Sequence, residues 1–284
     1  MATGVMERRL RPTSAAEAAQ SQADHPDAEV IAGGTLVIAD RALGRSAPPS
    51  YLLLSGAADL HGVTHEADGV HAGAMATLAE LHRAEPGPML DIALRALGGP
   101  QIRNRGTLGG NIAGRRPAHT LLPCLIALGA SVRLVGPSGA RAVPVMDFVA
   151  TGLGPADIVA GVRIPQGGDF QRFTRVARRN GPGYAIASVA LSIDAAGRTV
   201  TTGLGGVGPT PLAAAAADGF LAAAVDWGAR SMPAGTAEEY GRLLAENCQA
   251  VSDDNASADY RRHAVAVMGR RLVEDWTEEA THGH

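Results

Sequence analysis

The feature that most constrains this chain is the glycine-rich segment RNRGTLGGNIAGRR, from Arg103 to Arg116. Glycine tolerates positive φ and lets a ligand or another backbone come against the main chain. A second glycine turn, AGGT at 32–35, follows a short apolar run that is typical of a strand. Successive N–H groups in such turns can form an anion nest. Each segment is therefore a candidate anion site, and a tight turn that binds nothing is the alternative for each.

Neither segment is a common phosphate-binding motif. Gly106, Gly109 and Gly110 are spaced G-x-x-G-G, which differs from G-x-G-x-x-G, and no lysine follows as a P-loop requires. This disfavours a Rossmann or P-loop fold. Thr35, Thr107 and Asn111 carry groups that can hydrogen-bond phosphate, ribityl or ring atoms. The residues alone therefore predict, at most, an anionic cofactor held by two backbone nests.

Composition excludes several other classes of protein. The net charge of -3 gives no reason to expect nucleic acid or an anionic membrane as a partner. An iron–sulfur cluster normally needs four thiolates, and the chain has only Cys124, which we expect in the core, and Cys248. Two separated cysteines are typical of reduced thiols in the cytoplasm. We expect no secretory signal, because no apolar run follows the basic residues near the N-terminus. We expect no membrane span, because no stretch of about 18 uncharged apolar residues occurs.

Periodicity predicts an α/β first half and then an antiparallel sheet followed by helices. The expected strands of the first half are 29–32, 51–54, 69–73, 131–135 paired with 140–145, and 158–164. Its expected helices are 15–22, one capped at Thr77, 88–97, and 121–128. The second half is expected to have strands 170–177, 185–194 and 198–206, and helices 211–225, 237–251 and 258–279.

Four segments together carry a family resemblance. They are AGGT at 32–35, PQIRNRGTLGGNIA at 100–113, GGVGPTPL at 205–212 and SADYRRHAVAVMGRR at 257–271. In this order they resemble the FAD-binding medium subunit of the molybdopterin hydroxylases, the family of aerobic carbon monoxide dehydrogenase and bacterial xanthine dehydrogenase. The resemblance runs from about Leu10 to about Glu278.

The resemblance implies an α+β protein with a PCMH-type FAD-binding domain at 1–166, made of two α/β subdomains at about 1–55 and 56–166. A C-terminal domain of antiparallel sheet and helices would follow at 167–284. The implied function is an FAD-dependent oxidoreductase subunit that passes electrons from a 2Fe-2S subunit to an acceptor such as NAD⁺, a quinone or oxygen. Substrate chemistry would belong to a molybdopterin-binding large subunit.

The resemblance also implies which residues contact FAD, and it names no catalytic residue and no metal ligand. The expected contacts are Ala32, Gly33, Gly34, Thr35, Leu36, Gly106, Thr107, Leu108, Gly109, Gly110, Asn111, Thr120 and Tyr184.

Three positions depart from the family pattern. Leu36 stands where the family commonly has Asp or Ser, Thr120 where an Asp is expected, and Gly183 where an Asp often precedes the aromatic. A hydroxyl at 120 loses the stronger charge-assisted bond to the cofactor. The altered run from Gly114 to Thr120 motivates one alternative, a stand-alone flavin oxidoreductase that acts directly on a small metabolite. The loss of the expected polar residues at 36, 120 and 183 motivates another, a degenerate scaffold without FAD.

Several charged or polar residues have open roles. Arg115 and Arg116 fit phosphate contact, stabilisation of a reduced flavin, recognition of an acidic substrate, or a solvated turn. His119 is either a proton donor near a flavin or an ordinary loop histidine. Tyr184 either stacks on the ring or is buried in a strand.

The remaining polar clusters are expected to be structural. The arginine pairs 178–179 and 261–262 are expected at the surface. Asp253-Asp254-Asn255 is expected to cap the last helix, and His61 with His65 lacks the further ligands of a metal site.

Overall fold

The computed structural model describes residues 8–45, 48–178 and 184–282 of the chain. Its contacts divide the chain into two compact units, each assembled from separate segments. The first unit comprises Met1–Glu85, Gly98–Gly114 and Ser131–Ile164, and the second Pro86–Leu97, Arg115–Ala130 and Pro165–His284.

The first unit contains a small parallel sheet with strand order β1-β3-β2. Its elements are β1 (Arg8–Leu10), α1 (Ala15–Asp24), β2 (Glu29–Ile31), α2 (Val37–Ala42) and β3 (Ser50–Leu53). Helix α1 begins where Ser14 accepts a hydrogen bond from the N–H of Glu17 and the carboxylate of Asp59 accepts one from the N–H of Ala15. Its buried alanines share one apolar cluster with Leu52, and this cluster fixes the helix against the sheet.

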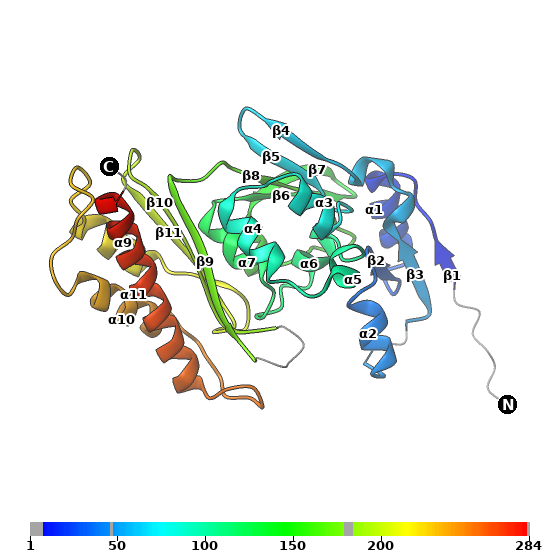
Figure 1. Ribbon diagram of the computed structural model, residues 1–284. Helices are drawn as coiled ribbons and strands as arrows, with labels where there is room; N and C mark the ends of the chain where they lie inside the picture. The colour runs from blue at the N-terminus through cyan, green and yellow to red at the C-terminus, as the bar shows by residue number, and fades with distance from the viewer. Residues whose placement is uncertain (1–7, 46–47, 179–183, 283–284) are drawn as a thin grey trace. The chain divides into compact units, whose positions relative to one another are not determined.

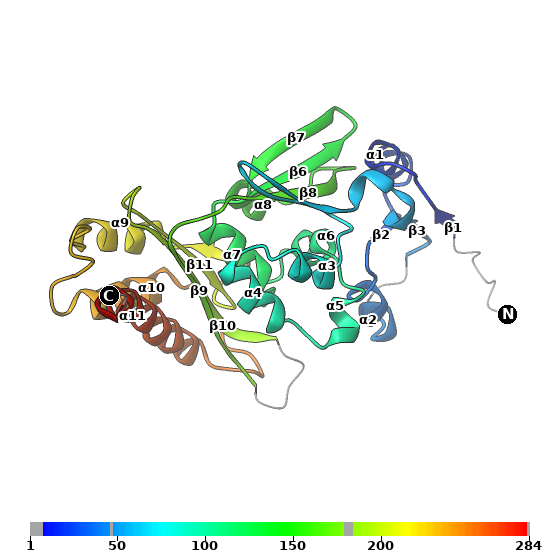
Figure 2. The same ribbon diagram turned by 45° about the horizontal axis from the view of Figure 1, so that its top comes forward.

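A five-stranded antiparallel sheet with order β4-β5-β8-β6-β7 forms the rest of this unit (Figure 2). Its strands are β4 (Val63–Glu66), β5 (Gly69–Gly73), β6 (Ser131–Gly136), β7 (Gly139–Pro144) and β8 (Ile158–Ile164). The helices are α3 (Leu78–Arg83), α5 (Pro100–Arg103), α6 (Leu108–Ala113) and α8 (Val145–Thr151), with 3-10 turns at Leu54–Gly56 and Ala58–Leu60. Helix α6 packs on β5 and β8, and the same sheet adds Ile158 and Ala160 to the apolar cluster of α1.

The second unit is built on an antiparallel sheet with order β12-β11-β10-β9. Its strands are β9 (Phe170–Ala177), β10 (Ala185–Asp194), β11 (Thr199–Gly205) and β12 (Leu212–Ala213). Its helices are α4 (Pro88–Arg95), α7 (Leu121–Ala127), α9 (Ala215–Ala224), α10 (Thr236–Asn247) and α11 (Ala258–His282). Figure 1 shows α9, α10 and α11 on one face of this sheet and α4 and α7 on the other.

The alternation along β10 explains this layering. Val189, Leu191 and Ile193 are fully buried in the apolar cluster that the three C-terminal helices complete. Period-two geometry turns Ser188 and Ser192 to the opposite face, where α7 lies. There a Cβ built on Gly203 would lie 1.9 Å from the carbonyl oxygen of Pro123, so only glycine lets α7 approach the sheet this closely.

The structure confirms the predicted fold class and most of the predicted elements. The capping box at Thr77 is present, since its hydroxyl accepts from the N–H of Glu80 and its N–H donates to the Glu80 carboxylate. Two expected elements differ in the structure. The glycine-rich segment after Gly106, expected as a turn, forms α6. The helix expected at 211–225 begins only at Ala215, because Leu212–Ala213 pairs with β11.

No helix in the described ranges combines the length and the apolar character that a membrane crossing requires.

A buried carboxylate ties three elements of the second unit together. Thr202 of β11 donates to Asp218 of α9 through its hydroxyl at 2.5 Å and its N–H at 3.1 Å. The Tyr240 hydroxyl of α10 lies 2.6 Å from the Thr202 hydroxyl. Burial disfavours the charged form and raises the pKa of Asp218 to about 6, although both Thr202 bonds oppose that rise.

We predict that Asp218→Asn removes a pH-dependent cost to stability. The wild-type carboxyl binds its proton more tightly folded than unfolded, so it favours folding below its unfolded pKa of 3.8 and opposes folding once the pH exceeds about 6. The free energy of unfolding of the variant relative to wild type should therefore rise by about 2 kcal/mol between pH 4 and pH 7. Urea titrations across this range check it. Asp259→Asn, with a 97% exposed side chain, is the control, and an equally flat difference for both variants would contradict the prediction.

Candidate cofactor site in the first unit

The first glycine segment joins β2 to α2 and offers backbone donors. Gly34 adopts φ +77, a left-handed conformation that suits glycine. The N–H groups from Gly34 to Val37 donate to no acceptor in the part of the chain that the structure describes. Leu36 stands at the N-cap of α2 and has no side-chain capping bond. This segment therefore has the free, neighbouring N–H groups that an anion nest needs.

The second glycine segment uses its donors internally. The N–H of Leu108 donates to the Ala76 carbonyl oxygen and the N–H of Gly109 to that of Ala74, both at 2.9 Å. The N–H of Gly110 donates to the Thr107 hydroxyl at 3.2 Å, which makes Thr107 the N-cap of α6. The prediction of two backbone nests was therefore wrong for this segment, because capping and anchoring bonds consume its N–H groups.

The two segments lie side by side. A Cβ built on Gly33 would lie 1.9 Å from the carbonyl oxygen of Arg105, and one on Gly106 would lie 3.5 Å from the Thr35 hydroxyl oxygen. A Cβ built on Gly110 would lie 3.6 Å from that of Ala32. Most of the residues predicted to contact the cofactor are thus brought together within the first unit, around glycine-to-backbone contacts.

Asn111 adds an unsatisfied polar atom to this arrangement. Its side-chain Oδ1 is buried and has no hydrogen-bond partner in the described chain. A buried acceptor without a donor costs roughly 1–3 kcal/mol, so a native protein keeps one for a reason. A ligand hydroxyl or ring N–H placed against α6 would satisfy it.

A local charge imbalance in the segment that contains α6 was missed by the sequence analysis. Between Asp91 and Asp147 the chain has no acidic residue, while it has Arg95, Arg103, Arg105, Arg115, Arg116, Arg133 and Arg141. The whole-chain charge of -3 does not reveal this excess of positive charge. Of these arginines, Arg103 and Arg105 lie in the first unit directly before α6.

Thr120 and Tyr184, the other predicted contacts, belong to the second unit, so their role as contacts stays a prediction. Thr120 is buried at the N-cap of α7, next to buried His119. Tyr184 is 54% exposed, so its interpretation as a buried strand residue was wrong. Gly183 lies outside the described residues.

Arg115 and Arg116 follow α6 and keep their open roles. Arg115 has φ +43, which is uncommon for a residue with a side chain, and it begins the second unit, whereas the preceding Gly114 ends the first.

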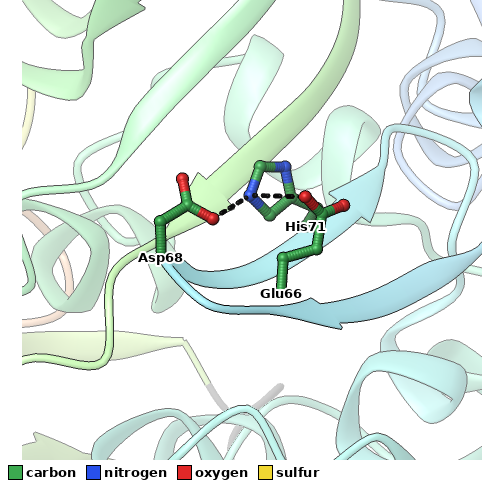
Figure 3. A group of neighbouring side chains, drawn as sticks. All are labelled: Glu66, Asp68 and His71. Carbon is green, nitrogen blue, oxygen red and sulfur yellow. Dashed lines mark hydrogen bonds and ion pairs between the residues drawn. The ribbon is translucent and has the colours of Figure 1, made fainter.

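A second polar cluster, on the hairpin of β4 and β5, is an ion-pair group (Figure 3). The ligand atoms of Glu66, Asp68 and His71 lie within 4.8 Å of one another. The Nε2 of His71 lies 2.8 Å from a carboxylate oxygen of Asp68, and this hydrogen bond lowers the pKa of that carboxyl. Arg163 lies 3.5 Å from the other oxygen of the same carboxylate, so Asp68 is already engaged by two neighbouring side chains.

The chain is similar to known proteins over nearly its whole length. Residues 5–167 match the FAD binding domain in molybdopterin dehydrogenase, and residues 172–276 match the CO dehydrogenase flavoprotein C-terminal domain. The carbon monoxide dehydrogenase medium chain of Afipia carboxidovorans is 32% identical over 267 residues, which cover 87% of this chain and 88% of that one. The nicotine 6-hydroxylase medium subunit of Paenarthrobacter nicotinovorans is 30% identical over 279 residues, with 94% and 95% covered.

Solved structures are similar over nearly the full length. A crystal structure of the Cu,Mo-CO dehydrogenase matches with a TM-score of 0.84 and 28% identity, covering 96% of this chain and 98% of that one. Quinoline 2-oxidoreductase from Pseudomonas putida 86 matches with a TM-score of 0.84 and 25% identity, covering 97% and 98%.

We predict that Gly33→Ala separates the two glycine segments. The added methyl group would meet the Arg105 carbonyl oxygen, and overpacking of this kind costs about 1–3 kcal/mol or more. Thermal unfolding should show the loss of stability, together with weaker retention of the cofactor. Gly219→Ala is the control, because a Cβ there meets nothing within 4 Å and lies in a helix, where alanine is favoured. Equal stability of the two variants would contradict this prediction.

Proposed function

The chain belongs to the family of FAD-binding medium subunits of the molybdopterin dehydrogenases, and on this premise we propose the contacts that hold its cofactor and the partners with which it works. It is an FAD-binding oxidoreductase subunit. The observation that carries the proposal is the pairing of two glycine segments, one with free backbone N–H groups and the other with the unsatisfied acceptor of Asn111.

The two segments differ in what they give to FAD. We assign the pyrophosphate to the N–H groups from Gly34 to Val37, where no side chain competes for the donors. The second segment gives a closely packed glycine surface and the Asn111 acceptor, which suits a hydroxyl or an N–H of the cofactor. Ala32, Gly33, Gly106, Thr107, Leu108, Gly109 and Gly110 shape this surface, and Thr120 and Tyr184 are proposed as further contacts by family resemblance. When bound, the isoalloxazine supplies the redox chemistry.

We propose that the electrons come from a partner subunit, because the two cysteines of this chain are too few to hold an iron–sulfur cluster. Cys124 and Cys248 are buried and free, and burial raises the pKa of Cys248 to about 11 and that of Cys124 further. Neither thiol is poised as a thiolate ligand. The relatives are medium subunits of larger dehydrogenases. We propose a 2Fe-2S subunit as electron donor, a molybdopterin-binding large subunit for substrate chemistry, and a cytoplasmic location, which fits two reduced thiols.

A stand-alone flavin oxidoreductase is the second candidate function, and the altered run from Gly114 to Thr120 favours it. It predicts that the flavin in the isolated chain is reduced by a small metabolite. The subunit function predicts that it is reduced only when the iron–sulfur partner and its substrate-oxidising subunit are added. Anaerobic visible spectra with and without these partners separate the two.

We predict that the isolated chain retains FAD through gel filtration, seen as a flavin absorption spectrum. Release of the cofactor and chromatography distinguish FAD from FMN, which lacks the pyrophosphate. A colourless chain that takes up neither flavin would contradict the function and would support the degenerate scaffold.

We predict that Asn111→Leu separates cofactor binding from stability. Loss of one ligand hydrogen bond costs about 1.4 kcal/mol, so the Kd for FAD should rise about tenfold. The unliganded variant should unfold at the same or a higher temperature, since it no longer buries an unsatisfied acceptor. Asn104→Leu, on an exposed turn of the same unit, is the matched control. An unchanged Kd for the Asn111 variant would refute the assigned contact.

A further inference from the structure

Arg261 is buried in the second unit, which contradicts its expected place at the surface. Only 6% of the residue is exposed. Its Nη1 donates to the carbonyl oxygen of Gly206 at 2.8 Å and to that of Ile186, and its Nη2 donates to the Asp253 carboxylate at 2.7 Å. Its neighbour Arg262 does lie at the surface, paired with Asp259. A buried charge with this many acceptors is a structural clamp, since burial of an unpaired charge is strongly unfavourable.

The segment before α11 is shaped to neutralise this charge. Burial alone would raise the pKa of Asp253, but hydrogen bonds from the N–H groups of Asn255 and Ala256 and from Arg261 hold it well below its usual range. The sequence predicts that Asp253 caps α11, and this prediction is wrong because its carboxylate is bonded to Asn255, Ala256 and Arg261. That role belongs to Ser257, whose hydroxyl accepts from the N–H of Tyr260.

The two carbonyl groups that Arg261 joins come from different strand ends: Ile186 lies at the beginning of β10, and Gly206 lies in the turn directly after β11. Gly206 has φ +76, and a Cβ built on it would lie 2.4 Å from the Ile186 carbonyl oxygen. The turn therefore brings two carbonyl oxygens together at the beginning of β10 and the end of β11. A guanidinium can donate to both at once, whereas an ammonium group is a single point of charge.

This turn supports the segment that precedes α7. The N–H of Gly206 donates to the Pro117 carbonyl oxygen at 2.8 Å. A Cβ built on Gly205 would lie 2.8 Å from the Cγ of Pro123, so the turn also touches the first turn of α7. Pro117 and Pro123 flank His119 and Thr120, both buried. Arg261 is thus connected to the segment of Thr120 through the turn at Gly206 and the hydrogen bond from Gly206 to Pro117.

We propose that Arg261 is a positioning residue for the flavin site. Through Gly206 it holds residues 117–120 in the conformation in which Thr120 meets the cofactor. The inference rests on the proposed function for the role of Thr120, while the mechanical link is a property of the second unit alone.

Two variants, Arg261→Met and Arg261→Lys, test the link in the full-length chain by hydrogen exchange. With methionine the Gly206 amide and the peptide that covers 118–122 should exchange at least about tenfold faster, because the bond to Pro117 loses its support. Lysine should give an intermediate rate. The matched control is Thr202→Val, which removes buried hydrogen bonds from the same sheet without touching the turn. It should lower the melting temperature and leave these amides protected.

Flavin binding forms the second readout. The methionine variant should release FAD faster and change the flavin circular dichroism, the lysine variant should recover part of both, and Thr202→Val should change neither. Unchanged exchange at Gly206 and 118–122 in Arg261→Met would overturn the proposal, whether or not the chain binds flavin. Altered exchange with unaltered flavin signals would also overturn it as a positioning role. A wild-type chain that binds no flavin would refute the proposed function and, with it, the positioning role. The hydrogen-exchange rates would still show whether Arg261 supports residues 117–120 through Gly206.

Discussion

The close contact between Gly33 and the Arg105 carbonyl group is the constraint on which the rest of the cofactor site depends. The two backbones approach so closely that no side chain fits at position 33. This contact, with that of Gly110 on Ala32, brings the segment after β2 against the beginning of α6, the helix that carries Asn111. Neither segment would form a site alone. The segment after β2 has free N–H donors but encloses no cavity by itself, and the segment at α6 has already used its N–H donors. Glycine at 33 is thus a packing requirement as much as a ligand requirement.

The division into compact units does not follow the order of the sequence. The chain passes between the units five times, and residues with positive φ lie at or beside four of these points: Glu85, Gly98, Arg115 and Gly129. Helices α4 and α7 fall within the FAD-binding family region at 5–167, yet they pack on the sheet of the second unit. The domain boundary at 166/167 therefore stays a prediction. The packing of α4 and α7 on β9, β10 and β11 joins residues from both sides of that boundary.

Sequence patterns predicted the elements whose signals are local. The capping box at Thr77, the alternation along β10 and the apolar run of α7 each depend on neighbours a few residues away. What escaped prediction depends on distant partners. The donors of α6 are consumed by carbonyl groups of Ala74 and Ala76, and Arg261 is buried because two carbonyl groups and Asp253 converge on it. An arginine pair in a helix looks the same in sequence whether it faces solvent or a buried turn.

The departure at Leu36 has a different meaning once the local geometry is known. An Asp or Ser at the N-cap of α2 would accept a hydrogen bond from an N–H group two or three residues later. Those groups belong to Ile38 and Ala39, outside the donors from Gly34 to Val37 that we assign to the pyrophosphate. The N–H groups from Gly34 to Val37 therefore stay available with or without a polar side chain at position 36. The change to Leu36 costs α2 a capping bond and leaves the nest complete, so it is no argument for decay of the site.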